Sequence, residues 1–214
     1  MIPEQKPALL FLICRIHIDR LIARAEKQQS SCAKQSTVQM GAGWQMKPKM
    51  LTIVQAETPQ QIETARALIV EYATWLEFNL CFQGFEEEMR RLPGKYAPPA
   101  GRLLLGLWDR QPAGVIALRP LDEDRQRGLC EMKRLYVRPE FRGHEIGLAL
   151  AERAIAEAAK IGYTRMRLDT VSGKMDHAIA MYRALGFAET VPYYNTPVGE
   201  TKFMELALAA GSVE

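Results

Sequence analysis

The chain has 214 residues, of which 48% are hydrophobic and 25% charged, as in an ordinary soluble protein with enough chain for one well-packed domain. Its net charge of +3 is uneven, because residues 1–50 hold eight Lys and Arg against three Asp and Glu, whereas residues 51–214 hold 20 against 22. The main body therefore has no electrostatic reason to bind nucleic acid. The longest apolar run near the start has about eight residues, too short for a bilayer that takes roughly 20, and we expect no membrane partner.

Cysteine and histidine are scattered, with no C-x-x-C pair among Cys14, Cys32, Cys81 and Cys130. This spacing argues against a zinc site or a disulfide framework. We therefore expect no bound metal and a cytoplasmic, reducing location. The sequence leaves a homodimer open.

Residues 1–49 contain a polar, Gln- and Ser-rich stretch that is typical of a poorly ordered extension or linker. Met46 or Met50 could equally be the start of translation. We place one domain at residues 50–214.

From residue 51 the predicted elements follow one another clearly. Residues 51–56 are β-rich, and Thr58, Pro59 and Gln61 form a capping-box start of a helix with proline at its first position. A short helix is expected around residues 85–92. A hairpin follows over residues 101–108 and 113–121, and a further strand over residues 128–137.

The second half alternates helices and strands. Apolar residues recur at helical spacing over residues 146–161, and a second helix over residues 174–185 is closed by Gly186. Strands are expected over residues 163–171, 187–194 and 201–208. The order β-α-α-β-β-β-α-β-α-β-β predicts an α/β fold, a central mixed sheet with helices on both faces.

The stretch "VRPEFRGHEIG", residues 137–147, leads from a strand into the long helix. Backbone amides that point from such a loop toward a helix N-terminus form a ready site for an anion. Gly143 and Gly147 allow close backbone approach, and Arg142 adds a positive charge. A tight strand-to-helix turn without any ligand would use the same residues, so the loop alone does not decide.

Residues 51–208 resemble the GCN5-related N-acetyltransferase (GNAT) superfamily. The segment "LYVRPEFRGHEIGLAL" is similar to the family's acetyl-CoA loop, [QR]-x-x-G-x-[GA], at residues 142–147. The segment "AIAMYRALGF" is similar to the family's later helix-strand segment, and the order of elements also agrees.

The resemblance implies where acetyl-CoA would bind. Backbone amides of residues 142–148 would hold the pyrophosphate, and the strand 134–137 would splay from its neighbour and hydrogen-bond the pantetheine arm. The implied cofactor-binding residues are Leu135, Tyr136, Val137, Arg142, Gly143, His144, Glu145, Ile146, Gly147 and Leu148. His144 would lie beside the phosphates, as a solvated loop residue rather than a base. The sequence departs from the family at Glu145, where the family has glycine, and at Met175, where it often has asparagine.

Two residues are candidates for catalysis. An amine acceptor with a pKa around 10 is only about 0.1% free base at pH 7, so a proton must be removed. Glu131, on the strand that feeds the loop, is the candidate base, and an exposed strand glutamate is the plainer alternative. Tyr182, which the resemblance puts near the thioester sulfur, is the candidate acid for the leaving thiolate; core packing is its alternative.

The acceptor site is less well defined. Two segments, "EFNLCFQGF" and "PYYNTP", occupy the places that border the acceptor pocket in the family. The candidate residues are Phe82, Gln83, Tyr193, Tyr194 and Asn195, although ordinary loop packing would also explain them.

The resemblance implies an enzyme that moves an acetyl group from acetyl-CoA to a primary amine by direct attack in a ternary complex. We expect a small metabolite or an amino acid as the acceptor. A protein lysine or N-terminus is an alternative acceptor, and a non-catalytic acyl-CoA-binding module is the alternative from a different class.

Overall fold

The computed structural model describes residues 50–76, 84–121 and 128–208, and the predicted order of elements is confirmed there. Two single-turn 3₁₀ helices, η3 (Gly94–Tyr96) and η5 (Pro139–Phe141), accompany the regular elements. The helices and strands are β1 (Leu51–Gln55), α2 (Pro59–Leu76), α3 (Phe85–Arg91), β2 (Arg102–Trp108), β3 (Gln111–Pro120), β4 (Leu129–Val137), α4 (Ile146–Ile161), β5 (Arg165–Val171), α5 (Asp176–Ala184), β6 (Ala188–Glu189) and β7 (Thr201–Ala207).

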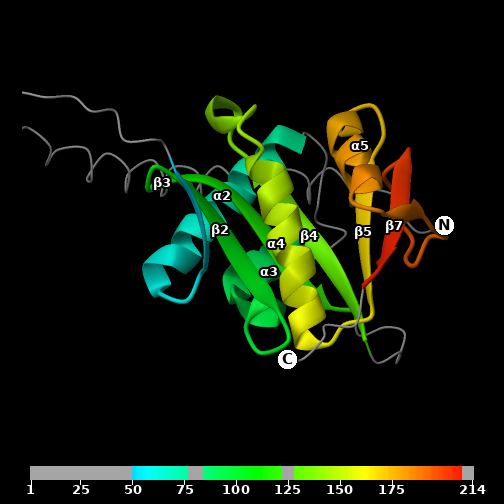
Figure 1. Cartoon of the computed structure of the whole chain (residues 1–214), viewed down its shortest axis with the longest axis horizontal. Helices are drawn as coiled ribbons and strands as arrows, with labels where there is room; N and C mark the ends of the chain where they lie inside the picture. The colour runs from blue at the N-terminus through cyan, green and yellow to red at the C-terminus, as the bar shows by residue number, and fades with distance from the viewer. Residues whose placement is uncertain (1–49, 77–83, 122–127, 209–214) are drawn as a thin grey trace, which may run out of the picture.

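The strands form one mixed sheet in the order β1-β2-β3-β4-β5-β7-β6. β4 and β5 run parallel, joined by the crossover helix α4, and every other neighbouring pair is antiparallel. Figure 1 shows α4 lying across one face of the sheet, with α2 and α3 behind it. This confirms the expected α/β class with helices on both faces.

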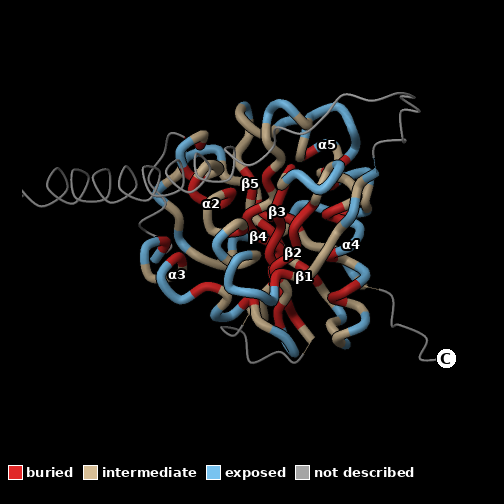
Figure 2. Tube along the Cα trace, turned by 90° about the vertical axis from the view of Figure 1, so that its left-hand side faces the viewer, coloured by how far each residue is buried: buried red, intermediate tan, exposed pale blue. Residues whose placement is uncertain are grey.

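Each face of the sheet has its own apolar core. On one side α2 and α3 pack on Leu103, Leu105 and Val115; on the other, α4 and α5 pack on Leu104 and Ile116. Neighbouring strand residues fall in different cores because side chains alternate along a strand. Figure 2 shows the buried residues concentrated along the central strands between the helices.

The start of α2 is the capping box expected from the sequence. The Thr58 hydroxyl accepts from the Gln61 amide at 3.2 Å, and the Gln61 side chain accepts from the Thr58 amide at 3.0 Å. Pro59 is the first helical residue. The helix entry is therefore set locally, since both orphan amides find partners within one turn.

The strand predicted over residues 187–194 is much shorter in the structure, and this prediction is wrong in length. Only Ala188 and Glu189 form β6. Pro192 cannot donate to a ladder, and the two tyrosines that follow it turn toward β4 and β5 instead. Within the described ranges, no helix is both long and apolar enough to cross a bilayer.

Candidate active site

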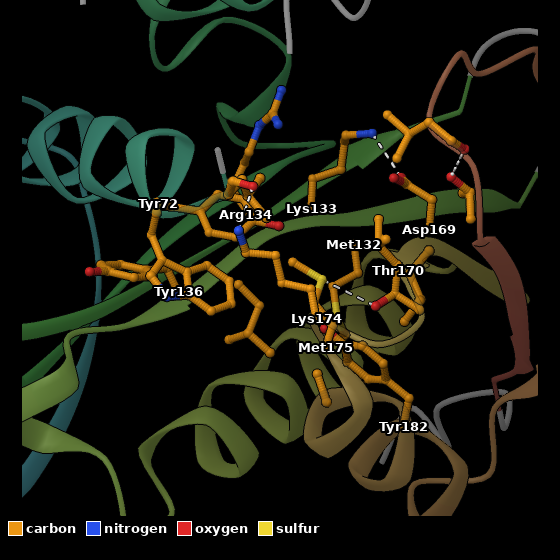
Figure 3. Close-up of a pocket in the computed structure, with 18 of the residues that line it drawn as sticks. Tyr72, Met132, Lys133, Arg134, Tyr136, Asp169, Thr170, Lys174, Met175 and Tyr182 are labelled. Carbon is orange, nitrogen blue, oxygen red and sulfur yellow. Dashed lines mark hydrogen bonds and ion pairs between the residues drawn. The ribbon is translucent and has the colours of Figure 1, made fainter. Parts of the chain in front are cut away.

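β4 and β5 diverge halfway along their length, and a cavity opens between them. They pair only at Leu129, Cys130 and Glu131 of β4. From Met132 onward both strands line a cavity of about 290 Å³ instead of bonding to each other. Figure 3 shows side chains from β4, β5, α2 and α5 around this space. The splayed strands that the resemblance implied are present.

A bulge at Arg134 changes the faces of β4. Val115 pairs with Tyr136 and Ala117 with Lys133, so β4 holds one residue more than β3 across this step, and Arg134 takes φ 60°. An extra residue exchanges the faces of the strand beyond it. Before the bulge Met132 packs under α4; after it Leu135 does so, while Tyr136 faces α2.

The splayed half of β4 offers backbone groups to a ligand. The Arg138 amide donates to the Ala113 carbonyl of β3 at 2.9 Å, and successive backbone groups of a strand point to opposite sides. The groups of Leu135 and Val137 therefore point away from β3, toward the cavity. The two residues named for the pantetheine arm are thus correctly oriented to receive an added strand.

The loop before α4 has the backbone shape of a glycine-rich anion site. Gly143 and Glu145 both adopt left-handed conformations, with φ 82° and φ 57°. Glu145 is the N-cap of α4, yet its exposed side chain makes no capping hydrogen bond. The first-turn amides of Ile146, Gly147 and Leu148 are therefore not taken by the cap and remain oriented for an anion.

Neighbouring contacts hold this loop in place. The ring of His144 stacks on Trp108, with centroids 4.6 Å apart, and the residue is exposed, as expected of a solvated loop histidine. Arg138 grips Glu71 of α2 through two hydrogen bonds of 2.9 and 2.6 Å. The Ile146 side chain is buried beneath the loop, so only its backbone can face a ligand.

Two cations flank the indole of Trp75 at the edge of the cavity. The guanidinium of Arg142 and the ammonium of Lys174 each lie 5.4 Å from a ring centroid of this residue. Lys174 also donates to the carbonyl of Leu76, the last residue of α2, at 2.7 Å. Arg142 was predicted from its motif, whereas Lys174 and Trp75 carried no motif that would have singled them out.

Tyr182 reaches the cavity from α5 and is also part of the core beneath it. Its side chain is 7% exposed and packs edge-on against Phe187, with centroids 5.7 Å apart. Figure 3 shows it beside Met175 among the lining residues. Burial raises the pKa of the phenol above its ordinary value, so the proton stays on the oxygen at neutral pH.

Met175 occupies the position where the family often has asparagine. Its sulfur accepts a hydrogen bond from the Thr170 hydroxyl at 3.3 Å, and it lines the cavity. The side chain therefore supplies an apolar wall in place of an amide.

Glu131 is buried in a cluster of charged residues. It is not one of the described residues that line the cavity. One oxygen receives both Nε and Nη2 of Arg119 at 2.7 Å. The other receives the Lys133 ammonium at 3.3 Å and the Tyr193 hydroxyl at 2.9 Å. Three hydrogen bonds and one further ion-pair contact thus surround a group that has about four lone-pair sites. Direct removal of a proton from the acceptor by Glu131 does not fit this geometry.

Asp169 is the carboxylate that the sequence analysis missed. It lies on β5, lines the cavity, and pairs with Lys133 at 3.1 Å. Burial alone would raise its pKa, but the Lys133 charge and hydrogen bonds from Lys133 and Tyr194 outweigh burial and lower it. The signal was a single acidic residue in the strand "RMRLDTV", which becomes informative only once β5 is known to border the cavity.

The five predicted acceptor-site residues have different outcomes. Tyr194 lines the cavity, whereas Tyr193 points to Glu131 and Asn195 is exposed outside the lining. Phe82 and Gln83 lie outside the described residues. The segment around Tyr194 thus borders the cavity mainly through this one tyrosine and through Thr196 and Val198 further along.

Comparison with known proteins agrees with this geometry. The model of the Acetyltransferase (GNAT) family matches residues 69–187. An uncharacterized N-acetyltransferase of Schizosaccharomyces pombe is 35% identical over 165 residues, covering 77% of this chain and 99% of that protein.

Solved structures share the fold at low sequence identity. A GNAT-family acetyltransferase from Staphylococcus aureus has a TM-score of 0.61 at 18% identity and covers 75% of this chain and 100% of its own. The Salmonella typhimurium protein yncA, solved with its cofactor acetyl-CoA, has a TM-score of 0.52 at 23% identity and covers 76% of this chain and 96% of its own.

Proposed function

This chain belongs to the acetyltransferase (GNAT) family, and from that premise we propose that it transfers an acetyl group from acetyl-CoA to a primary amine on a small molecule. The observation that carries the proposal is the splay between β4 and β5. It places the free backbone side of residues 135–137 next to a cavity whose edge leads to the first turn of α4. The solved neighbour from Salmonella typhimurium, with its acetyl-CoA, supports the same donor.

The donor would bind through this chain's backbone and the side chain of Arg142. Amides of residues 143–148 would face the diphosphate, with the charge of Arg142 beside them. The pantetheine arm would lie along Leu135 and Val137 as an added strand. None of these contacts needs the side chain of Glu145, so its departure from glycine leaves the anion site in place.

The reaction is a direct displacement. The amine nitrogen forms a bond to the thioester carbon, the carbon–sulfur bond breaks, and the amine proton is lost to solvent or to a neighbouring base. Holding both reactants in one cavity supplies proximity and orientation, which can contribute about 7–11 kcal/mol to lowering the barrier. We propose that Tyr182 donates a hydrogen bond to the departing sulfur.

The raised pKa of Tyr182 refines this role. A free thiol has a pKa near 8.5, below that of a buried phenol, so complete proton transfer from Tyr182 to a thiolate is uphill. A neutral phenol that stays protonated can nevertheless stabilise the charge that develops on sulfur. Tyr182 would thus act mainly as a hydrogen-bond donor in the transition state.

Glu131 would then act at a distance. Its carboxylate holds Lys133, which lines the cavity, and Tyr193, which does not. We propose that Glu131 orients the cavity wall, and that the acceptor proton leaves through water or a residue nearer the cavity.

A free-thiol assay with acetyl-CoA and a panel of amines tests the proposal. We expect thiol release that depends on an amine, with mass spectrometry showing the acetylated product. Acetyl-CoA binding in calorimetry without turnover on any small amine or peptide would instead favour a non-catalytic acyl-CoA-binding module. Turnover on peptide amines alone would favour a protein acceptor.

A further inference from the structure

Two carboxylates lie on either side of one lysine at the cavity, and of the two only Asp169 is among the described residues that line it. The ammonium of Lys133 lies 3.3 Å from Glu131 and 3.1 Å from Asp169. The neighbouring tyrosines divide between them, because Tyr193 bonds to Glu131 and Tyr194 to Asp169. Figure 3 shows Lys133 extended toward Asp169 at the upper side of the cavity. The two acids thus have similar partners but different positions relative to the cavity.

Counting donors separates the two acids. Glu131 accepts three hydrogen bonds, has a further ion-pair contact with Arg119 and is 1% exposed. Asp169 receives donors from Lys133 and Tyr194, its side chain is 19% exposed, and it lines the cavity. Counted over the residues that the structure describes, Asp169 therefore retains about two acceptor sites that an incoming donor can use.

The charge of Asp169 makes it suitable for binding a cationic group rather than for removing a proton. Lys133 and Tyr194 stabilise the ionised carboxylate, so it remains negative at neutral pH. An amine acceptor arrives almost entirely as ammonium, with three N–H donors. A carboxylate with free lone pairs in a partly dry cavity is the natural partner for such a group.

We propose that Asp169 is the anchor for the ammonium group of the acceptor and so selects cationic primary amines over neutral molecules of the same shape. This proposal rests on the proposed function. Asp169 lines the cavity together with Thr170 and Tyr194, away from the loop that would bind the donor. Its role would be to position the acceptor and to determine specificity for it.

The test compares Asp169→Asn with wild type on the best amine of the panel. A charge-assisted hydrogen bond contributes about 1.5–3 kcal/mol, which corresponds to roughly a 10- to 100-fold rise in the amine KM. We expect this rise with an acetyl-CoA dissociation constant within about twofold of wild type by calorimetry. Glu205→Gln is the matched control, because Glu205 pairs with Arg165 and Arg167 outside the cavity lining and should leave the amine KM unchanged.

A second measurement needs no variant. In the wild-type enzyme, an amidinium analogue of the amine, which keeps the positive charge and the N–H donors but is a poor nucleophile, should compete with the amine at least about tenfold better than the neutral carbon isostere, the discrimination that one charge-assisted hydrogen bond gives. Equal inhibition by the two analogues, or an unchanged amine KM in Asp169→Asn, would overturn the role of Asp169. The proposed function would still hold in that case, provided that wild type acetylates the amine. Failure of wild type to acetylate any amine would overturn both.

Discussion

The two halves of β4 belong to one strand but have different neighbours. In the first half, Leu129 to Glu131 bond to strands on both sides, and every oxygen of Glu131 has its donors. In the second half, Tyr136 and Val137 pair with β3, and the side of the strand away from β3 opens on the cavity. The difference shows that one strand can serve as a sheet interior and as a ligand-binding edge when its neighbour diverges.

The bulge at Arg134 lies between the two halves and is held by an ion pair. Arg134 makes two hydrogen bonds of 2.9 Å to Glu88 of α3, and its guanidinium lies 5.3 Å from the ring centroid of Phe85. The Arg134 side chain is 3% exposed and that of Glu88 13%. Loss of this ion pair should therefore destabilise the bulge that separates the two halves of β4.

Glu88→Gln should have the largest effect on stability. Removing one partner of a buried pair leaves the other charge without compensation and typically costs about 3–5 kcal/mol. We expect a loss of this size in chemical denaturation. Glu87→Gln on the same helix is the control, since among the described residues Glu87 pairs with two exposed arginines, and we expect a change within about 0.5 kcal/mol. Equal losses in both variants would contradict a special role for the bulge anchor.

The same pair predicts how stability depends on pH. Burial alone would raise the pKa of Glu88, but the charge and hydrogen bonds of Arg134 outweigh it and lower the pKa below its ordinary value. The stabilisation is therefore present above the unfolded-state pKa of about 4.3 and is lost as the pH falls through the lower folded-state pKa. We expect the stability difference between wild type and Glu88→Gln to shrink below about pH 4, as followed by denaturation at several pH values.

Tyr182→Phe should have the next largest effect, on the splayed side of the sheet. The variant keeps the ring against Phe187 and removes only the hydroxyl. We expect kcat to fall roughly 10²-fold or more, the usual size for a positioned acid or donor, with little change in melting temperature. A kcat within a few fold of wild type would mean that Tyr182 serves only the core.

Glu145→Gly tests the loop beyond the splayed half. Glycine accepts the left-handed backbone at residue 145 without strain and removes a negative charge from the neighbourhood of the phosphates. We expect acetyl-CoA to bind about three- to tenfold tighter in calorimetry, or about 1 kcal/mol, with a smaller gain at high salt. Weaker binding would show that the loop accommodates Glu145 in the bound state.

A chain that starts at Met50 should show the smallest effect. The composition of residues 1–49 predicts that they are dispensable, and β1 begins at Leu51. We expect the same melting temperature and the same affinity for acetyl-CoA as for the full chain. A drop of several degrees on removal would show that these residues contribute to the domain.

Elements with a local cause were predictable from the sequence. The capping box, the long amphipathic α4 and the loop at Arg142 each depend on residues that are neighbours in the chain. The cavity wall was not, because Lys133 and Asp169 meet only through the parallel pairing of β4 and β5. Glu131 was singled out by its place along the strand. Its chemistry, however, depends on how many donors contact its carboxylate. Three of its four contacts come from Arg119 and Tyr193, each at least twelve residues away in the sequence.

The left-handed backbone at Glu145 means that the loop does not need glycine to take its shape. The stacking of His144 on Trp108, the grip of Arg138 on Glu71 and the burial of Ile146 fix the chain on both sides. Shape and composition are therefore separable at this position. A search pattern that requires glycine at this position would miss a loop of this kind, whereas a pattern based on backbone torsion angles would find it. The side chain at residue 145 is then a position where a single substitution can adjust donor affinity without changing the fold.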